Sequence, residues 1–299
     1  MYQIEKFSAP LSQKEMKLFE SLVDVRDRHF LKKSEQTSQI WVAFFQGKPV
    51  GIVITVNAES PFYSEIHSLF VLPEHRSQNL GSRLLLCAEN YLKEKACKYS
   101  TLFFRHDQDL AQSNEKFLAR HGWNKSTCSN LLYLFHSSIF NAPWLQLFYD
   151  KPLPSQFREV SWKQVKEKDR ILLQALEKEN AFPYYVSPFR DEQFVEPLNS
   201  LALYKDEEVV GWMITHRILP HMIRYQAFFV EKQFQHTGIP MKILCDSIKL
   251  QIGSSVPYAL AEINVSAAEP DWLRFASKRL APYAQARGFI RQSWKQFSA

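Results

Sequence analysis

One local pattern occurs twice in this chain of 299 residues. Segments of the first half align with segments of the second at nearly one offset: Val50–Thr55 with Val210–Thr215 (210 − 50 = 160), Val71–Gly81 with Val230–Pro240 (230 − 71 = 159), and Gly122-Trp123 with Gly288-Phe289 (288 − 122 = 166). A fixed offset is the signature of a repeated structural unit. The sequence therefore predicts two copies of one fold, each near the usual size of a domain.

The best defined part of the first copy runs from Glu65 to Lys95. Apolar residues that favour strands lead up to Pro73, a polar turn follows, and from Gly81 leucines and alanine recur at helical spacing. This is the pattern of a strand, a tight turn and a helix. The first amides of such a helix have no partner within it, and its dipole places partial positive charge there. The turn is therefore a candidate site for a phosphate or pyrophosphate.

On this stretch the chain resembles motif A of the GNAT-type N-acetyltransferases. The motif reads Val-x-Pro-x-x-(Arg/Gln)-x-x-Gly-x-(Gly/Ala), and Val71, Pro73, Arg76 and Gly81 match it. Asn79 stands where the first glycine is usual. Because Asn tolerates left-handed backbone angles better than other residues with a side chain, we expect the turn to form.

The resemblance implies an α/β fold class with two tandem GNAT-like domains. Each would be a mixed, mostly antiparallel twisted sheet flanked by helices, with splayed fourth and fifth strands that admit the pantetheine arm of acetyl-CoA. Three prolines between Asn141 and Pro154 indicate a break in regular structure. We therefore expect an N-terminal domain over residues 1–140 that binds acetyl-CoA, a linker over 141–154, and a C-terminal domain over 155–299.

The resemblance also implies the residues that would contact acetyl-CoA, the cosubstrate. A backbone N–H of the fourth strand would hold the thioester carbonyl, and the turn would hold the pyrophosphate. On this sequence those positions are Leu69, Phe70, Val71, Arg76, Ser77, Gln78, Asn79, Leu80, Gly81 and Ser82.

Glu65 and His67 are the candidate catalytic residues. Glu65 lies eleven residues before Arg76 (76 − 65), a spacing similar to that of the catalytic glutamate in the histone-acetyltransferase branch of the family. His67 shares its strand face, because side chains alternate along a strand. A carboxylate and an imidazole there could relay the proton of an amine. The alternative is that both lie on a solvated strand end. No ligand spacing for a metal is present.

Other positions depart from the family pattern. Leu118 stands where many members have a Tyr that meets the CoA sulfur. In the second copy Pro240 lacks an amide to donate, and Arg224, which aligns with Glu65, cannot act as a base (224 − 65 = 159). The C-terminal domain is therefore expected to be degenerate as a catalyst.

Composition limits the partners. A net charge of +6 without a dense basic run argues against nucleic acid, and four scattered cysteines are typical of a reducing compartment. The N-terminus lacks the pattern of a signal peptide, so we expect a cytoplasmic protein that does not bind membranes.

The function expected is an acetyltransferase with a small-molecule or peptide amine as acceptor. The alternatives are a non-catalytic acetyl-CoA-binding or protein-interaction module and a tRNA-dependent aminoacyl transferase.

Overall fold

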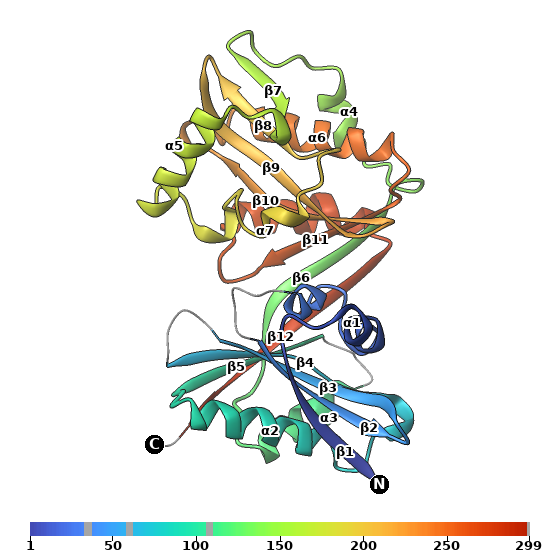
Figure 1. The fold of residues 1–299 in the computed structure, drawn as a ribbon. Coiled ribbons are helices and arrows are strands. Elements are labelled where there is room, and N and C mark those ends of the chain that lie inside the picture. The colour runs from blue at the N-terminus through green and yellow to red at the C-terminus, as the bar shows by residue number, and fades with distance from the viewer. Residues whose placement is uncertain (33–37, 58–61, 106–109, 298–299) are drawn as a thin grey trace. The chain divides into compact units, whose positions relative to one another are not determined.

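The computed structural model describes residues 1–32, 38–57, 62–105 and 110–297 (Figure 1). The chain forms two compact units. Unit 1 consists of residues 1–130 together with 288–299, and unit 2 consists of residues 131–287. The end of the chain thus returns to the first unit. Among the described residues, none of the helices is long and apolar enough to cross a membrane.

Unit 1 is a mixed sheet with helices on both faces (Figure 1). Its strands follow the order β1-β2-β3-β4-β5-β12, in which β4 and β5 are parallel and the other neighbours whose register is known are antiparallel. Its strands and helices are β1 (Tyr2–Ser8), α1 (Gln13–Phe19), β2 (Ser38–Phe45), β3 (Lys48–Asn57), β4 (Tyr63–Val71), α2 (Leu80–Glu94), β5 (Tyr99–Arg105), α3 (Ala111–Arg120), the start of β6 (Thr127–His136) and most of β12 (Ala286–Gln296).

Local sequence explains several of these boundaries. Ser12 caps α1, with its side chain accepting from the amide of Glu15 while the Glu15 carboxylate accepts from the Ser12 amide, as the capping-box pattern predicts. Gln46 and Gly47 turn the chain from β2 into β3 with φ of 50° and 75°. Two consecutive left-handed residues match the twist of the flanking strands, so the chain forms a tight hairpin here.

The sheet of unit 1 has a core on each face because its central strands are apolar on both sides. On one face, α2 and α3 cover a cluster that includes Ile66, Leu84 and Leu85. On the other, α1 and the short helices that follow it cover Ile40, Ile52 and neighbouring residues. Each cluster contains side chains with no exposure to solvent.

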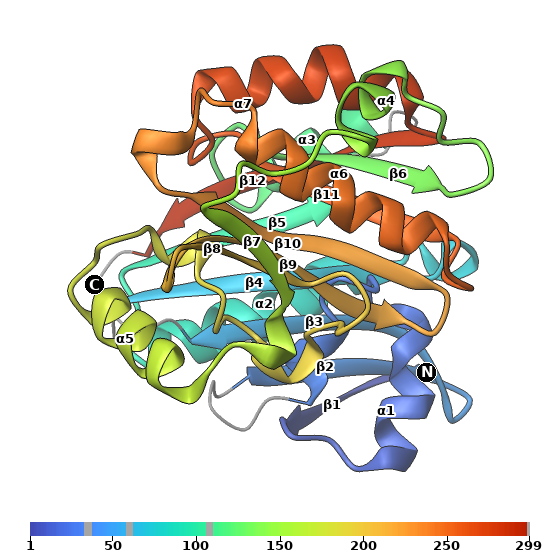
Figure 2. The same cartoon turned by 90° about the horizontal axis from the view of Figure 1, so that it is seen from above.

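Unit 2 repeats this plan over residues 131–287. Its strand order is β6-β11-β10-β9-β8-β7. Figure 2 shows α4, α6 and α7 on one face of this sheet and α5 on the other. Its elements after β6 are α4 (Pro143–Tyr149), β7 (Phe157–Ser161), α5 (Glu167–Lys178), β8 (Leu201–Lys205), β9 (Glu208–Leu219), β10 (Met222–Val230), α6 (Ile239–Ile252), β11 (Tyr258–Asn264) and α7 (Pro270–Phe275).

The units differ from the expected domains in their boundaries. The position beside β5 is filled by the last strand of the chain, with Ile290–Gln296 pairing against Tyr99–Arg105. From Leu131 onward, β6 belongs to unit 2 instead of closing the first copy. The expected linker at 141–154 contains α4, whose Trp144 is 3% exposed in the unit 2 core. Gly288 lies inside a strand and does not end a helix as Gly122 does.

The expected splay of the fourth and fifth strands is present in both units. Of the described residues of β4 and β5, only Tyr63–Ile66 and Tyr99–Leu102 pair. In unit 2, only Met222–Tyr225 and Tyr258–Ala261 pair. Each sheet therefore has a fork at the same point of the fold.

Candidate active site

A β-bulge in β4 lies at the fork of unit 1. His67 pairs with Ile54 and Phe70 with Ile52, so Ser68 and Leu69 stand opposite a single residue of β3. Ser68 has a φ of 51°, a conformation that costs energy for any residue with a side chain. Since the pairing with β5 ends at Ile66 and Leu102, the residues of β4 after Ile66 have no partner strand on that side. The fork and the bulge thus occur at the same point of β4.

Glu65 and His67 meet on the face of β4 that α1 covers, as their spacing predicts. The Nε2 of His67 is 3.0 Å from Oε2 of Glu65, and the two side chains are 12% and 32% exposed. A third residue completes the cluster. Asp27, from the loop after the first helical segment, lies with its Oδ1 3.7 Å from Nδ1 of His67. Its other oxygen accepts a hydrogen bond of 2.8 Å from the hydroxyl of Ser68.

The two carboxylates determine the protonation of His67. Burial would lower the pKa of this histidine, but the interactions with Asp27 and Glu65 outweigh burial and raise the pKa from 6.5 to about 9. Burial would raise the pKa of Asp27, yet His67, Arg26 and the Ser68 hydroxyl hold that pKa well below its ordinary value. The cluster therefore contains a charged imidazolium at neutral pH.

Tyr63 completes the surroundings of Glu65. Its hydroxyl donates to Oε1 of Glu65 over 3.2 Å. Burial, followed by the negative charge of Glu65, raises the pKa of Tyr63 to about 12, so the phenol stays protonated. Each oxygen of Glu65 thus has a donor, and the Glu65 side chain as a whole is still 32% exposed.

The turn after β4 has the geometry of an anion site. Asn79 is the N-cap of α2 with φ 59° and ψ 12°, so the left-handed turn forms without the usual glycine. Arg76 donates from Nε to the carbonyl of Val71 over 3.0 Å, which holds the turn against the end of the strand. The amides that follow Asn79 open the 15-residue helix α2. The turn thus offers free donors where the resemblance implies pyrophosphate.

Gly81 is open on the side where a side chain would project. A Cβ there would meet only the ring of Phe117, at 3.7 Å, an ordinary contact. Leu118, where the family often has Tyr, is 3% exposed in the core beneath α2. It offers no proton donor, so the described residues show no counterpart of that acid at this position.

The equivalent turn in unit 2 has the same left-handed backbone conformation but one backbone N–H donor fewer. Gly238 caps α6 with φ 83°, and Pro240 lies in the first turn of the helix. Proline fits that position but removes one amide. Arg224 takes the place of Glu65 and lies 3.4 Å from Nδ1 of His216 through its Nη2. Unit 2 thus lacks both the carboxylate and one donor.

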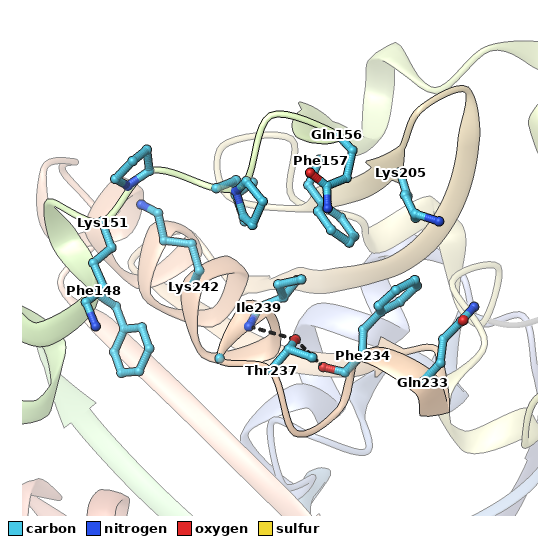
Figure 3. Close-up of a pocket in the computed structure, with 14 residues that line it drawn as sticks. Phe148, Lys151, Gln156, Phe157, Lys205, Gln233, Phe234, Thr237, Ile239 and Lys242 are labelled. Carbon is cyan, nitrogen blue, oxygen red and sulfur yellow. Dashed lines mark hydrogen bonds between the residues drawn. The ribbon is translucent and has the colours of Figure 1, made fainter.

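A cavity of about 560 Å³ borders this second turn (Figure 3). Three lysines line it, together with apolar side chains of α4, β7 and the turn. Lys242 is tied to Asp246 at 2.7 Å, whereas Lys151 and Lys205 lie over the rings of Phe148 and Phe234. The cavity is positive but has no carboxylate among its lining residues. It belongs to unit 2, whereas Glu65 and His67 belong to unit 1.

The fold and the turn agree with comparisons to known proteins. Residues 2–123 match the sequence profile of the acetyltransferase (GNAT) family. No curated protein matches the chain by sequence. A tandem GNAT protein from the clavulanic acid biosynthesis pathway has a similar structure over 99% of both chains, with a TM-score of 0.75 and 11% identity.

Two further structures share the fold. A GCN5-related N-acetyltransferase from Sphaerobacter thermophilus matches 99% of this chain and 97% of its own, with a TM-score of 0.60 and 14% identity. A glucosamine N-acetyltransferase region of a fungal multi-domain β-N-acetylglucosaminidase matches 98% of this chain and 38% of that one, with a TM-score of 0.65 and 15% identity. Residues 2–123 thus match the GNAT family in sequence. The whole chain has the tandem GNAT fold.

Proposed function

We propose that the protein is an acyl-CoA-dependent N-acetyltransferase that moves an acetyl group from acetyl-CoA to a small-molecule or peptide amine, and that unit 1 carries the reaction. The observation that supports this most is the position of Glu65 beside the fork between β4 and β5. The same strand leads into the left-handed turn at Asn79. A base and an anion site are thus held by one strand–turn–helix segment.

The residues present fit acetyl-CoA. The amides of Leu80, Gly81 and Ser82, with Arg76 nearby, would hold its pyrophosphate, and a β4 amide at Leu69–Val71 would hold its carbonyl oxygen. When bound, acetyl-CoA supplies a thioester whose carbonyl carbon an amine nitrogen can attack, with loss of the CoA thiolate. Among the described residues there is no cluster of side chains suited to a metal.

The chain's own groups then serve the transfer as follows. Glu65 takes the proton that the attacking nitrogen loses as the carbon–nitrogen bond forms. Amides beside the bulge stabilise the negative charge on the carbonyl oxygen, because they are fixed before the charge develops. The thiolate that leaves takes a proton from water, since Leu118 has none to give. Unit 2 contributes structure and acceptor contacts.

The test is release of free CoA from acetyl-CoA in the presence of a panel of amines. We expect turnover with at least one class of amine, and no release of CoA above background when the amine is left out. A second candidate, a non-catalytic acetyl-CoA-binding or protein-interaction module, is favoured by the buried Leu118 at the acid position. Acetyl-CoA binding without turnover of any amine would support that candidate instead.

A further inference from the structure

Asp27 lies on the opposite side of His67 from Glu65. It is 9% exposed, and its two oxygens reach two consecutive residues of β4. One lies 3.7 Å from Nδ1 of His67, and the other accepts from the hydroxyl of Ser68 at 2.8 Å. Asp27 is 40 residues from His67 in the sequence (67 − 27), so no local pattern relates them.

The ring of His67 is surrounded by two carboxylates and two aromatic rings. The carboxylates face its two nitrogens, and the ring centroids of Phe30 and Phe103 lie 4.6 Å and 5.1 Å from its own, with Phe103 stacked. A ring packed in this way has no room to swing between a substrate and a second partner. His67 is therefore held in one orientation, and it does not carry a proton by moving between two partners.

The pattern of partners also fixes its charge. A neutral imidazole donates from one nitrogen only, whereas a ring that faces a carboxylate at each nitrogen is satisfied when both carry protons. The charged groups around it are Asp27 and Glu65, with Tyr63 behind Glu65 and Arg26 near Asp27. A ring that already holds both protons cannot accept the proton of an amine. Glu65 is then the proton acceptor of the pair.

We infer that Asp27 is a positioning residue of the proposed transfer: through His67 it fixes the Glu65 carboxylate beside the fork, and through Ser68 it fixes the bulge whose amides face the gap. This inference rests on the proposed function. Because Ser68 is held left-handed while its hydroxyl bonds to Asp27, one buried carboxylate sets both the base and the strand irregularity beside it.

The experiment compares Asp27→Asn with Asp24→Asn. The first change keeps an acceptor for Ser68 and removes the charge that faces His67. The second change removes the carboxylate of Asp24, which lies in the same loop and pairs with Nε of Arg26 at 3.1 Å. The His67 ring is titrated by NMR in each full-length protein without substrate, and kcat and KM for acetyl-CoA are then measured across pH.

We expect the wild-type ring to titrate near pH 9, about two and a half units above an ordinary histidine, and the Asp27→Asn ring to titrate at least one unit lower. In that variant kcat should fall tenfold or more with KM for acetyl-CoA unchanged, while Asp24→Asn stays within twofold of wild type.

A wild-type ring that titrates near 6.5 would overturn the inference, and this measurement needs no variant to fold. Equal effects of the two substitutions would also overturn it. Absence of turnover in the wild type, with His67 titrating near 9, would reject the proposed function and leave the arrangement around Asp27 intact.

Discussion

Asn79 and Gly238 occupy the same place in the two units and have the same left-handed conformation, with φ of 59° and 83°. They are 159 residues apart, the offset at which the turns align (238 − 79). Asn is the residue with a side chain that adopts this region most readily, so unit 1 keeps the turn without glycine. The difference between the turns is therefore in the amides that follow: Gly81 in unit 1 and Pro240 in unit 2.

The first prediction concerns the amide of Gly81. Gly81→Pro should fold, because unit 2 carries Pro240 at the equivalent helical position, yet it removes a donor from the expected pyrophosphate site. We expect CoA binding to weaken by about 1.5–3 kcal/mol, the range for a hydrogen bond to a charged group. Gly81→Ala is the control, since it keeps the amide and its Cβ would meet only Phe117 at 3.7 Å. Calorimetry should separate the two variants, and equal CoA affinity in both would contradict the assignment of this turn.

The second prediction concerns the base. Glu65→Gln should lower kcat by about 10²-fold or more, the usual contribution of a general base, with little change in CoA affinity. His67→Gln should lower kcat less, because it removes the imidazole that holds Glu65 but leaves the Glu65 carboxylate itself. Steady-state rates at saturating acetyl-CoA would show this order. If His67→Gln is the more damaging change, or if the double variant is fully active, Glu65 does not receive the proton.

Stability should depend on pH through His67. Its pKa is raised in the folded protein to about 9 from 6.5. The stabilisation that protonated His67 gives the folded state is therefore complete below pH 6.5 and is lost as pH rises through 9. At about 1.4 kcal/mol per unit, the free energy of unfolding should fall by on the order of 3 kcal/mol over this range. The pKa of Asp27 is lowered, so its contribution is lost instead in acid. Urea unfolding at several pH values should show the alkaline loss in wild type and a much flatter profile in His67→Gln.

The asymmetry of the units gives a fourth prediction. Pro240→Gly restores the amide that the second turn lacks, while Arg224 still replaces the base. We expect this change to leave the rate of acetyl transfer within about twofold, because restoring a donor does not supply a proton acceptor. The rates of Pro240→Gly and of Gly81→Pro/Pro240→Gly are compared under the same conditions. Activity that survives Gly81→Pro and rises with Pro240→Gly would place the chemistry in unit 2.

A fifth prediction concerns the strand that returns to unit 1. The Nζ of Lys295, on β12, is 2.8 Å from Oε2 of Glu89, a carboxylate that is 2% exposed and also accepts from the indole of Trp123 at 2.8 Å. Lys295→Ala would leave a buried charge without its cation and should cost about 3–5 kcal/mol of stability. Lys14→Ala, at an exposed position of α1, should cost less than about 0.5 kcal/mol. Chemical unfolding measures both, and adding Glu89→Gln to Lys295→Ala should recover part of the loss.

Much of the fold follows from local sequence. The turn at Asn79 and the shared face of Glu65 and His67 follow from patterns within about a dozen residues, because turn chemistry and strand alternation are local rules. The partnership of β12 with β5 does not, since the residues of β6 form a strand equally well in either sheet. Asp27 was missed for a similar reason: a single carboxylate in a loop carries no periodicity. Its contacts with His67 and Ser68 come from the packing of this loop against β4.

The placement of β12 in unit 1 affects how the protein is made. A ribosome releases the N-terminal residues first, and domains commonly fold in that order during synthesis. Here the edge of β5 must wait for Ile290–Gln296, which are translated after the whole of unit 2. During that interval β5 presents an open edge, which invites pairing with other chains. Unit 1 is thus completed only after unit 2 has been translated, although Glu65 and the turn at Asn79 are translated long before unit 2.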